Sequence, residues 1–468
     1  MAEPFWTVSQ VLLATGGRFI SGSTKVTFGA VSTDTRTLAP GDLFLALTGP
    51  RFDGAEFARE AVQRGAGGLI VAAPLEDEDI KVPVIQVADP ERALGDLASY
   101  RRAAMADLKV VAITGSSGKT SVKEMCSAIL GEEYNVLKTK GNFNNLIGMP
   151  LSLLPVDPNH DVAVLEMGMN RPGEIARMAE IADPDIACIT NIQPAHLSGL
   201  HSVDGVAKAK GELFEGCKSW SILCVNFDDK RVRGLAREMH QDIIGFGRHR
   251  QAKVRATHVK NMGEEGMVFT LHIGSERVRL NLRAMGEHNV SNALAAAAIS
   301  HAAGLEICQI VAGLEKCRPV EKRMEVVTVQ GLKVVNDCYN ANPASMLAAF
   351  DAVAAMAGKG KSIAILGDML ELGEVSEKAH RRLGESVACK GFDYLLVFGE
   401  YARIVAQGAM DASMRLHQVR RLPDKEAIVA ELLGMVENEE IGAGDWLLVK
   451  GSRGMCMETI IEQLRKKL

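Results

Sequence analysis

The feature that most constrains the fold of this chain is an apolar, β-branched run that turns abruptly into a glycine-rich loop. Residues 110–113 read Val-Val-Ala-Ile, and residues 114–121 read Thr-Gly-Ser-Ser-Gly-Lys-Thr-Ser. Apolar residues then recur at helical spacing from Val122 to Leu130. This order predicts a strand, a tight loop and a helix, an arrangement that directs backbone N–H groups and the positive end of a helix dipole at one anion.

The loop residues predict a site for a nucleoside triphosphate. The glycines let the backbone curl around phosphate, Lys119 supplies a cation and Thr120 supplies a hydroxyl for Mg²⁺. Ile113 stands where the longer phosphate loop has glycine, so only the shorter pattern G-x-x-G-K-T is present. A glycine-rich turn with an exposed lysine is the alternative interpretation. The residues assigned to the phosphates are Gly115, Ser116, Ser117, Gly118, Lys119, Thr120 and Ser121.

Composition bounds the class of protein. A chain of 468 residues with 47% apolar content suggests about three globular domains. The net charge of −5, without a basic stripe, argues against a nucleic-acid partner. The nine cysteines form no C-x-x-C pair, so reduced thiols in the cytoplasm fit better than zinc or disulfides. Residues 1–17 carry no positively charged leader before an apolar core, and no apolar run reaches the length of a membrane span, so we expect a cytoplasmic protein.

Strand and helix patterns alternate along the whole chain, which predicts an α/β protein of three domains. Residues 1–106 form a small N-terminal α/β domain. Residues 107–317 form a central phosphate-loop domain with a mostly parallel, ATPase-like sheet, in which residues 253–282 read as antiparallel hairpins. Residues 318–468 form a third, Rossmann-like α/β domain.

Polar side chains at the ends of predicted central strands are candidate ligands. Glu166 follows the strand 161–165 and would reach a Mg²⁺ on the phosphate loop, unless it is a solvated strand-end glutamate. His196 follows the strand 186–189 and either binds metal or phosphate or is structural. On the helix 206–214, Lys208 and Lys210 read as ordinary solvated lysines.

Two further groups of polar residues suggest ligand contacts. His288, Asn289 and Asn292 crowd the start of an alanine-rich helix at 293–303 and exceed what one helix cap needs. In the third domain, polar sequences follow three strands, at residues 336–343, 367–369 and 450–454. Because such strand ends share one edge of a parallel sheet, we expect a common cleft that faces the nucleotide.

Taken together, these motifs resemble those of the Mur ligases, ATP-dependent enzymes that form amide bonds in peptidoglycan precursor synthesis. The family's short phosphate loop, T-G-x-x-G-K-T, accounts for Ile113. The resemblance covers essentially the whole chain. Within the family, the chain is most similar to the member that joins D-alanyl-D-alanine to UDP-N-acetylmuramoyl-tripeptide. Thr33 and Thr35 depart from the serines common in relatives. The segments that carry the resemblance are 32–36, 114–120, 140–145, 190–196, 209–212, 336–343 and 450–454.

The resemblance implies roles for particular residues. Catalytic groups would be Lys119, Glu166, His196 and Lys210, and the Mg²⁺ ligands Thr120, Glu166, His196 and Lys210, with Lys210 carbamylated, which reverses its reading as a solvated lysine. ATP would also contact His288, Asn289 and Asn292 on the adenine side, and Arg323, Asp337 and Asn340 on the ribose and phosphate side. Substrates would contact Ser32, Asp34, Arg36, Asn142, Asn145, Lys450 and Ser452.

The implied reaction is activation of a carboxylate by ATP as an acyl phosphate, followed by attack of the dipeptide amine. We expect the third domain to close over ATP and to bind that dipeptide. The implied process is cell-wall biogenesis, and with it cell shape, the cell cycle and cell division. Separately, the sequence has no heptad repeat or exposed apolar stripe that would require a partner, so we expect a monomer. The alternatives are another Mur-type or folylpolyglutamate-type ligase, a nucleotide-gated binding protein without ligase activity, and a phosphoryl-transfer kinase. The separate N-terminal domain argues against the folylpolyglutamate type.

Overall fold

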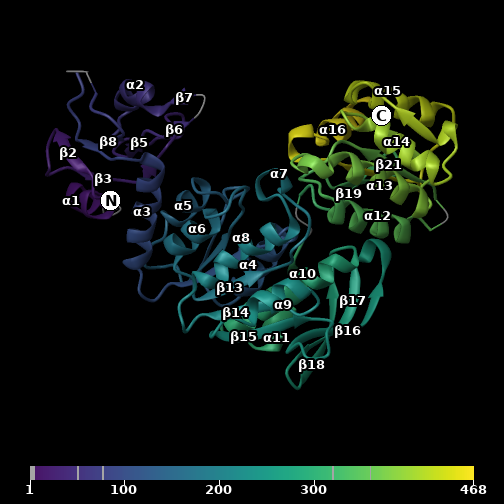
Figure 1. The fold of residues 1–468 in the computed structure, drawn as a ribbon, viewed down its shortest axis with the longest axis horizontal. Helices are drawn as coiled ribbons and strands as arrows, with labels where there is room; N and C mark the ends of the chain where they lie inside the picture. Colours follow the sequence, from purple (N-terminus) through teal and green to yellow (C-terminus); the bar gives the residue numbers. More distant parts are fainter. Residues whose placement is uncertain (1–5, 50–51, 76–78, 319–320, 359) are drawn as a thin grey trace.

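The computed structural model describes residues 6–49, 52–75, 79–318, 321–358 and 360–468. Within these residues, three large sheets with their helices lie along an arc, with the N-terminal part at one tip and the C-terminal part at the other (Figure 1). The predicted three-domain α/β fold is confirmed. Across the described ranges, the longest apolar helices fall short of what a membrane span requires.

The first sheet has the strand order β2-β9-β8-β5-β4 and is parallel apart from the β2–β9 pair. Residues 54–63 form a 3₁₀ turn followed by a short α-helix. The elements of this part are β1 (Trp6–Thr7), α1 (Val8–Thr15), β2 (Arg18–Ser21), β3 (Thr27–Phe28), β4 (Val31–Ser32), β5 (Leu43–Leu45), β6 (Thr48–Gly49), β7 (Phe52–Asp53), η1 (Gly54–Phe57), α2 (Ala58–Gln63), β8 (Gly68–Val71), β9 (Val84–Gln86) and α3 (Pro90–Ala103).

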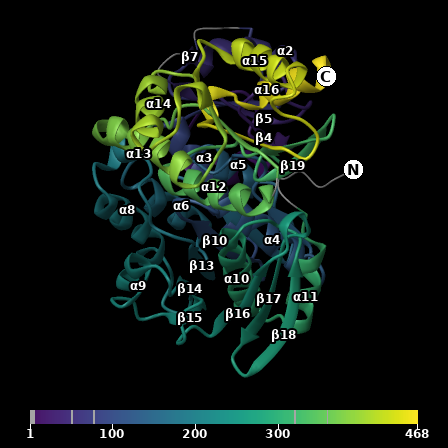
Figure 2. The same ribbon diagram turned by 90° about the vertical axis from the view of Figure 1, so that its right-hand side faces the viewer.

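The central sheet has nine strands in the order β11-β12-β10-β13-β14-β15-β16-β17-β18. It is parallel from β11 to β16 and antiparallel from β16 to β18, as the sequence predicted. The strands β16, β17 and β18 lie side by side in Figure 2. Its strands are β10 (Lys109–Thr114), β11 (Val136–Lys138), β12 (Val162–Glu166), β13 (Ile186–Ile189), β14 (Ile222–Asn226), β15 (Asp242–Gly247), β16 (Val254–Asn261), β17 (Met267–Ile273) and β18 (Glu276–Leu282).

Helices cover both faces of this sheet because successive side chains of β10 point to opposite faces. Val110 and Ala112 pack in a core with α3, α6 and α8, whereas Val111 and Ile113 pack in a second core with α4, α10 and α11. Helix α3 thereby joins the N-terminal sheet to the central one. The central helices are α4 (Lys119–Leu130), α5 (Gly148–Leu153), α6 (Glu174–Ala182), α7 (Leu197–Leu200), α8 (Val203–Glu215), α9 (Lys230–Ala236), η2 (Gly263–Glu265), α10 (Glu287–Ala302) and α11 (Ile307–Lys316).

The third sheet has the order β19-β20-β24-β21-β22-β23 and is parallel except for the β19–β20 hairpin. Its elements are β19 (Glu325–Val329), β20 (Leu332–Asn336), α12 (Pro343–Ala357), β21 (Ser362–Leu366), η3 (Gly373–Val375), α13 (Ser376–Cys389), β22 (Tyr394–Val397), α14 (Ala402–Asp411), η4 (Leu416–Gln418), β23 (Val419–Arg421), α15 (Lys425–Glu437), β24 (Trp446–Lys450), η5 (Arg453–Met455) and α16 (Glu458–Lys467).

One predicted boundary matters for the site. The alanine-rich helix α10 begins at Glu287, several residues before the predicted start at 293. Asn289 and Asn292 therefore lie inside the helix, in its first two turns, and are buried there. Their amide N–H groups donate to acceptors inside the fold, and both residues still line the cleft where the prediction placed a ligand.

Candidate active site

The ends of the central and third sheets enclose a cleft of about 1010 Å³. It combines the phosphate loop with residues from β12, from the start of α10 and from the third domain. Most sequence-predicted residues line it, namely Ser116, Ser117, Gly118, Lys119, Ser121, Asn142, Asn145, Glu166, His196, His288, Asn289, Asn292, Arg323, Asp337, Asn340 and Lys450. The predicted residues outside its lining are Gly115, Thr120, Lys210, Ser452, Ser32, Asp34 and Arg36.

The phosphate loop has the predicted strand–loop–helix geometry between β10 and α4. Gly118 has φ of +81°, and a Cβ there would lie 2.3 Å from Asn292 Oδ1. A Cβ on Gly115 would lie 1.8 Å from Thr190 Oγ1, so both positions require glycine. Lys119 is half-buried and donates from Nζ to the Gly115 carbonyl at 2.8 Å, so the alternative of an exposed lysine is wrong. Desolvation lowers the pKa of Lys119.

Glu166 ends β12 at the edge of the cleft, where the sequence placed it. Its side chain is buried, with the residue 1% exposed, so the alternative of a solvated glutamate is wrong. Asn144 Nδ2 donates to Glu166 Oε1 at 2.7 Å, and Thr139 Oγ1 accepts from the Glu166 N–H at 2.9 Å. Glu166 Oε2 is buried and receives no hydrogen bond from the residues that the structure describes. A carboxylate oxygen left free at a cleft is suited to a cation.

Asn144 is a site residue that the sequence reasoning missed. It lies in the motif 140–145, from which only Asn142 and Asn145 were selected. Asn145 instead accepts the Gly148 N–H at 2.8 Å with Oδ1, which satisfies the start of α5. The repeated asparagines of the motif were a signal, but only the tertiary contact shows which of them reaches Glu166.

Lys210 is buried on α8, with 1% of the residue exposed, whereas Lys208 is exposed. The residue-based reading of Lys210 as a solvated lysine is therefore wrong. Burial, and after it the charge of Lys119, lower its pKa well below the ordinary value. No hydrogen bond or ion pair to its amine is found among the described residues. A neutral, nucleophilic amine is the form that this environment favours.

Two contacts join the central and third domains across the cleft. Arg323 Nη2 donates to Thr120 Oγ1 at 2.7 Å, and the Arg323 guanidinium lies 4.0 Å from the centre of the Tyr339 ring. His196 Nδ1 lies 2.7 Å from Glu371 Oε2, which leaves Nε2 for another ligand. The bond to His196 lowers the pKa of Glu371. Glu371 follows the polar segment 367–369 but was not singled out from the sequence.

Of the three predicted ligand residues at the start of α10, His288, Asn289 and Asn292, the two asparagines form hydrogen bonds within the protein. Asn289 Nδ2 donates to the Met285 carbonyl at 2.8 Å, and Asn292 Nδ2 donates to Asn289 Oδ1 at 2.9 Å. These bonds fix the two amides, with Asn292 Oδ1 close to Gly118 of the phosphate loop. Burial lowers the pKa of His288, which favours its neutral form beside the cleft.

In the third domain, Lys450 is 2% exposed and forms an ion pair with Asp337. Its Nζ also donates to the Asn340 carbonyl at 3.1 Å, so one buried lysine orders two predicted ligand residues. Ser452 Oγ accepts the Leu370 N–H at 2.8 Å. The Ser452 hydroxyl therefore holds the loop after β21 and does not line the cleft.

The predicted substrate residues of the N-terminal part lie apart from this cleft. Arg36 Nη2 donates to Asp34 Oδ2 at 2.7 Å, and Arg36 Nε donates to Asp34 Oδ1 at 2.9 Å. This bidentate pair lowers the pKa of Asp34 to about 2. Ser32 Oγ donates to the Asp34 carbonyl at 3.1 Å, so the three residues form one ordered turn in which Arg36 is exposed and Ser32 and Asp34 are half-buried.

The side chains alone do not complete a metal site. Among the described residues, no three His, Cys, Asp or Glu side chains gather closely enough to hold a metal ion. The residues present nevertheless fit Mg²⁺, an ion that keeps several waters and binds through few carboxylates together with substrate phosphates. The free oxygen of Glu166 lies on the same cleft as the phosphate loop.

Comparisons with known proteins identify the family. The profile "Mur ligase middle domain" matches residues 113–300, "Mur ligase, glutamate ligase domain" matches 322–453, and "Mur ligase family, catalytic domain" matches 27–102. The chain is 38% identical over 451 residues to the UDP-N-acetylmuramoyl-tripeptide--D-alanyl-D-alanine ligase of Escherichia coli, with 94% of each chain covered.

Solved structures agree with that assignment. MurF from Acinetobacter baumannii superposes with a TM-score of 0.90 at 33% identity over 99% of both chains. The MurF ligase of Thermotoga maritima in complex with ADP superposes with a TM-score of 0.82 at 27% identity, covering 94% of this chain and 97% of that one. With the three domain profiles matched in order and relatives similar over nearly their full length, the chain belongs to the Mur ligase family of ATP-dependent ligases.

Proposed function

We propose that this chain catalyses the ATP-dependent addition of D-alanyl-D-alanine to UDP-N-acetylmuramoyl-tripeptide, with release of ADP and phosphate. The observation that carries the proposal is the shared cleft, in which Lys119, the free oxygen of Glu166 and Arg323 of the third domain meet. Relatives at 38% and 37% identity over more than nine-tenths of this chain carry that activity in their names. The product would be a UDP-N-acetylmuramoyl-pentapeptide for peptidoglycan synthesis.

The three domains divide the substrates among them in this proposal. Residues 1–106 would hold the uridine nucleotide through the ordered turn of Ser32, Asp34 and Arg36. Residues 107–317 would hold ATP, and residues 318–468 would close on ATP and hold the incoming dipeptide. Asn142 and Asn145 line the cleft on the central side and would contact the peptide stem.

Thr120, Glu166, His196 and Lys210 would hold Mg²⁺. When bound, the ion would neutralise charge on the ATP phosphates and on the oxygens of the transferred phosphoryl group. Lys210 would first react as a neutral amine with CO₂, forming an N–C bond and losing one proton, which turns it into a carbamate. The lowered pKa of its buried amine supports this step, because only the uncharged amine is nucleophilic.

The chemistry then needs positioning and charge stabilisation more than a protein nucleophile. An oxygen of the tripeptide carboxylate attacks the γ-phosphoryl group of ATP, which yields an acyl phosphate and ADP. Lys119, with its Nζ on the phosphate loop, would stabilise the charge that develops. The dipeptide amine then attacks the acyl carbon, the amide bond forms and phosphate leaves.

The third domain would move to exclude water from the acyl phosphate. Two contacts between side chains, Arg323–Thr120 and His196–Glu371, already join the two walls of the cleft. We expect small-angle scattering to show a more compact particle with nucleotide and tripeptide substrate than without them. An unchanged radius of gyration would contradict domain closure.

The test of the proposed function is phosphate release by the purified protein with Mg-ATP and UDP-N-acetylmuramoyl-tripeptide. Release should depend on D-alanyl-D-alanine, and mass analysis should find a product heavier by one dipeptide less water. Release without a new amide would favour a nucleotide-gated protein that only hydrolyses ATP. A product formed only with a different amine would assign the chain to another branch of the ligase family.

A further inference from the structure

The linker into the third domain, residues 321–324, is bound more tightly to that domain than a passive hinge requires. Lys322 and Met324 have φ of +59° and +51°, a conformation that costs energy in residues with a side chain. The Lys322 N–H donates to Glu325 Oε2 at 3.1 Å, and the Met324 N–H donates to Asp337 Oδ1 at 3.2 Å. Between them, Arg323 reaches Thr120 of the phosphate loop. The strained backbone thus aims one side chain at the nucleotide side of the cleft.

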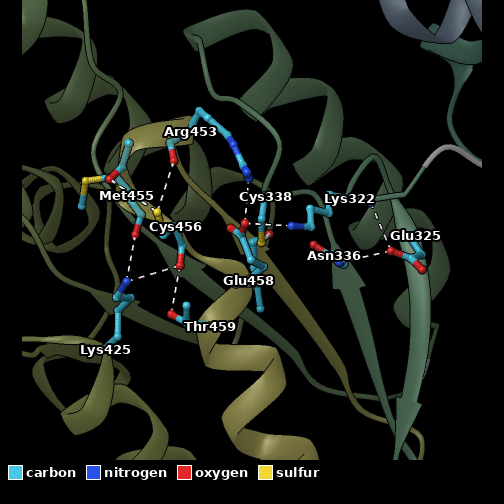
Figure 3. Close-up of polar contacts among 12 residues, drawn as sticks. Lys322, Glu325, Asn336, Cys338, Lys425, Arg453, Met455, Cys456, Glu458 and Thr459 are labelled. Atoms are coloured by element: carbon cyan, nitrogen blue, oxygen red, sulfur yellow. Dashed lines mark hydrogen bonds and ion pairs between the residues drawn. The ribbon is translucent and has the colours of Figure 1, made fainter. Parts of the chain in front are cut away.

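Glu458, the first residue of α16, connects this linker to a second part of the site (Figure 3). Its Oε1 accepts from Lys322 Nζ at 2.8 Å and from Arg453 Nη1 at 2.7 Å. Arg453 follows the Lys450–Ser452 segment and lines the cleft. One carboxylate therefore fixes the linker and the loop after β24 to each other.

The surroundings of Glu458 make these two bonds strong. The residue is 9% exposed, and no donor among the described residues reaches its buried Oε2. Burial acts to raise the pKa of Glu458, but the bonds from Lys322 and Arg453 outweigh it and hold the pKa below the ordinary value. The carboxylate is buried while its two partners are partly exposed, so removing it would release both Lys322 and Arg453 from one shared acceptor.

The loop that carries Arg453 is also held from its other side. Lys425 Nζ of α15 donates to the carbonyls of Met455 and Cys456 at 3.3 and 3.4 Å, as Figure 3 shows. The loop has few ways to move independently of the sheet. The linker is connected to this held loop through Lys322 and Glu458.

We propose that Glu458 is a positioning residue that holds the linker and the Arg453 loop in one arrangement, so that Arg323 stays over the phosphate loop. The inference rests on the proposed function, because it takes the cleft to bind adenine nucleotide. In this role Glu458 does not contact substrate itself but acts through Lys322 and Arg453. A role limited to stabilising the start of α16 is the alternative, since an acidic first residue favours any helix.

The experiment compares Glu458→Gln with Glu431→Gln in the full chain. Glu431 also pairs with an arginine, Arg420, in the same domain, and it lies outside the lining of the cleft. We expect calorimetric titration with Mg-ADP to give a dissociation constant about tenfold higher for Glu458→Gln. Amide hydrogen exchange of residues 321–326 should be faster in that variant. Glu431→Gln should match the wild type in both measurements.

A second variant keeps the inference testable if Glu458→Gln folds poorly. Lys322→Met should weaken ADP binding in the same direction, and the double variant should be no weaker than the worse single one, because both changes break one connection. Additive effects of the two substitutions on ADP binding would overturn the inference. So would a lowered melting temperature with an unchanged ADP dissociation constant and unchanged hydrogen exchange of the linker. Wild-type protein that does not bind ADP would instead refute the proposed function.

Discussion

Replacing Asn144 by alanine should impair Mg²⁺ binding by Glu166 although Glu166 itself is unchanged. The Asn144 amide is the side-chain donor that holds Glu166 Oε1, at 2.7 Å, and Oε2 has no donor among the described residues. In Asn144→Ala the buried carboxylate loses that donor and is left to the attraction of Lys119, which lies near enough for the two charges to perturb each other. A carboxylate drawn toward the lysine no longer faces the metal side of the cleft.

The magnitude follows from the kind of bond that is lost. A hydrogen bond to a buried charged group contributes about 1.5–3 kcal/mol, which corresponds to about a 10- to 150-fold change in an equilibrium constant. Partners that orient metal ligands have effects in the same range, about 10- to 100-fold. We therefore expect the Mg²⁺ concentration for half-maximal phosphate release to rise at least about tenfold.

The assay is phosphate release with saturating ATP and both substrates, titrated with Mg²⁺. The backbone contact of Asn144, whose carbonyl accepts from the Gly168 N–H at 2.7 Å, survives the substitution, so the protein should fold. The control is Asn438→Ala on the exposed end of α15, which should leave the titration unchanged. A half-maximal Mg²⁺ concentration within twofold of the wild type in Asn144→Ala would refute the reasoning.

Three further predictions concern the fold and the site. His380 is fully buried and its Nε2 accepts the Met369 N–H at 2.9 Å, and burial lowers its pKa below 6.5. Because the unfolded chain protonates His380 more readily than the folded chain does, the free energy of unfolding should keep its full His380 contribution above about pH 6.5 and lose it on acidification. The melting temperature measured from pH 8 to 5 should therefore fall less steeply for His380→Gln than for the wild type. Gly118→Ala should weaken ADP binding at least about tenfold by calorimetry, since its Cβ meets Asn292 at φ of +81°; binding as tight as in the wild type would show that the loop yields easily. Lys210→Met should melt no lower than the wild type, because it removes a buried amine without a partner among the described residues, yet ligation should slow about a hundredfold. A lysine that serves packing alone would give full activity in the methionine variant.

Local sequence was enough for the phosphate loop because its geometry is written into adjacent residues. A β-branched run, two glycines and a helical spacing fix strand, loop and helix without help from distant segments. The same holds for Glu166, since the end of a buried parallel strand lies at a defined edge of the sheet. Resemblance in ordered motifs then supplied the family.

Local sequence misjudged the side chains whose surroundings come from far along the chain. Lys208 and Lys210 differ only in which face of α8 they occupy, and packing decides that Lys210 is the buried one. The start of α10 was placed too late because alanine content marks the helix interior, whereas the first turns contain buried asparagines.

By itself, the sequence determined the α/β class, the three-part organisation and the position of the phosphate loop, since these depend on periodicity and on residues close together in the chain. Only the tertiary structure decided that Asn144 rather than Asn145 holds Glu166, that Glu371 reaches His196, and that Glu458 ties the linker to the cleft. Each of these contacts joins elements separated by loops or whole domains. Their partners are selected by how the sheets pack, and a local pattern carries no record of that packing.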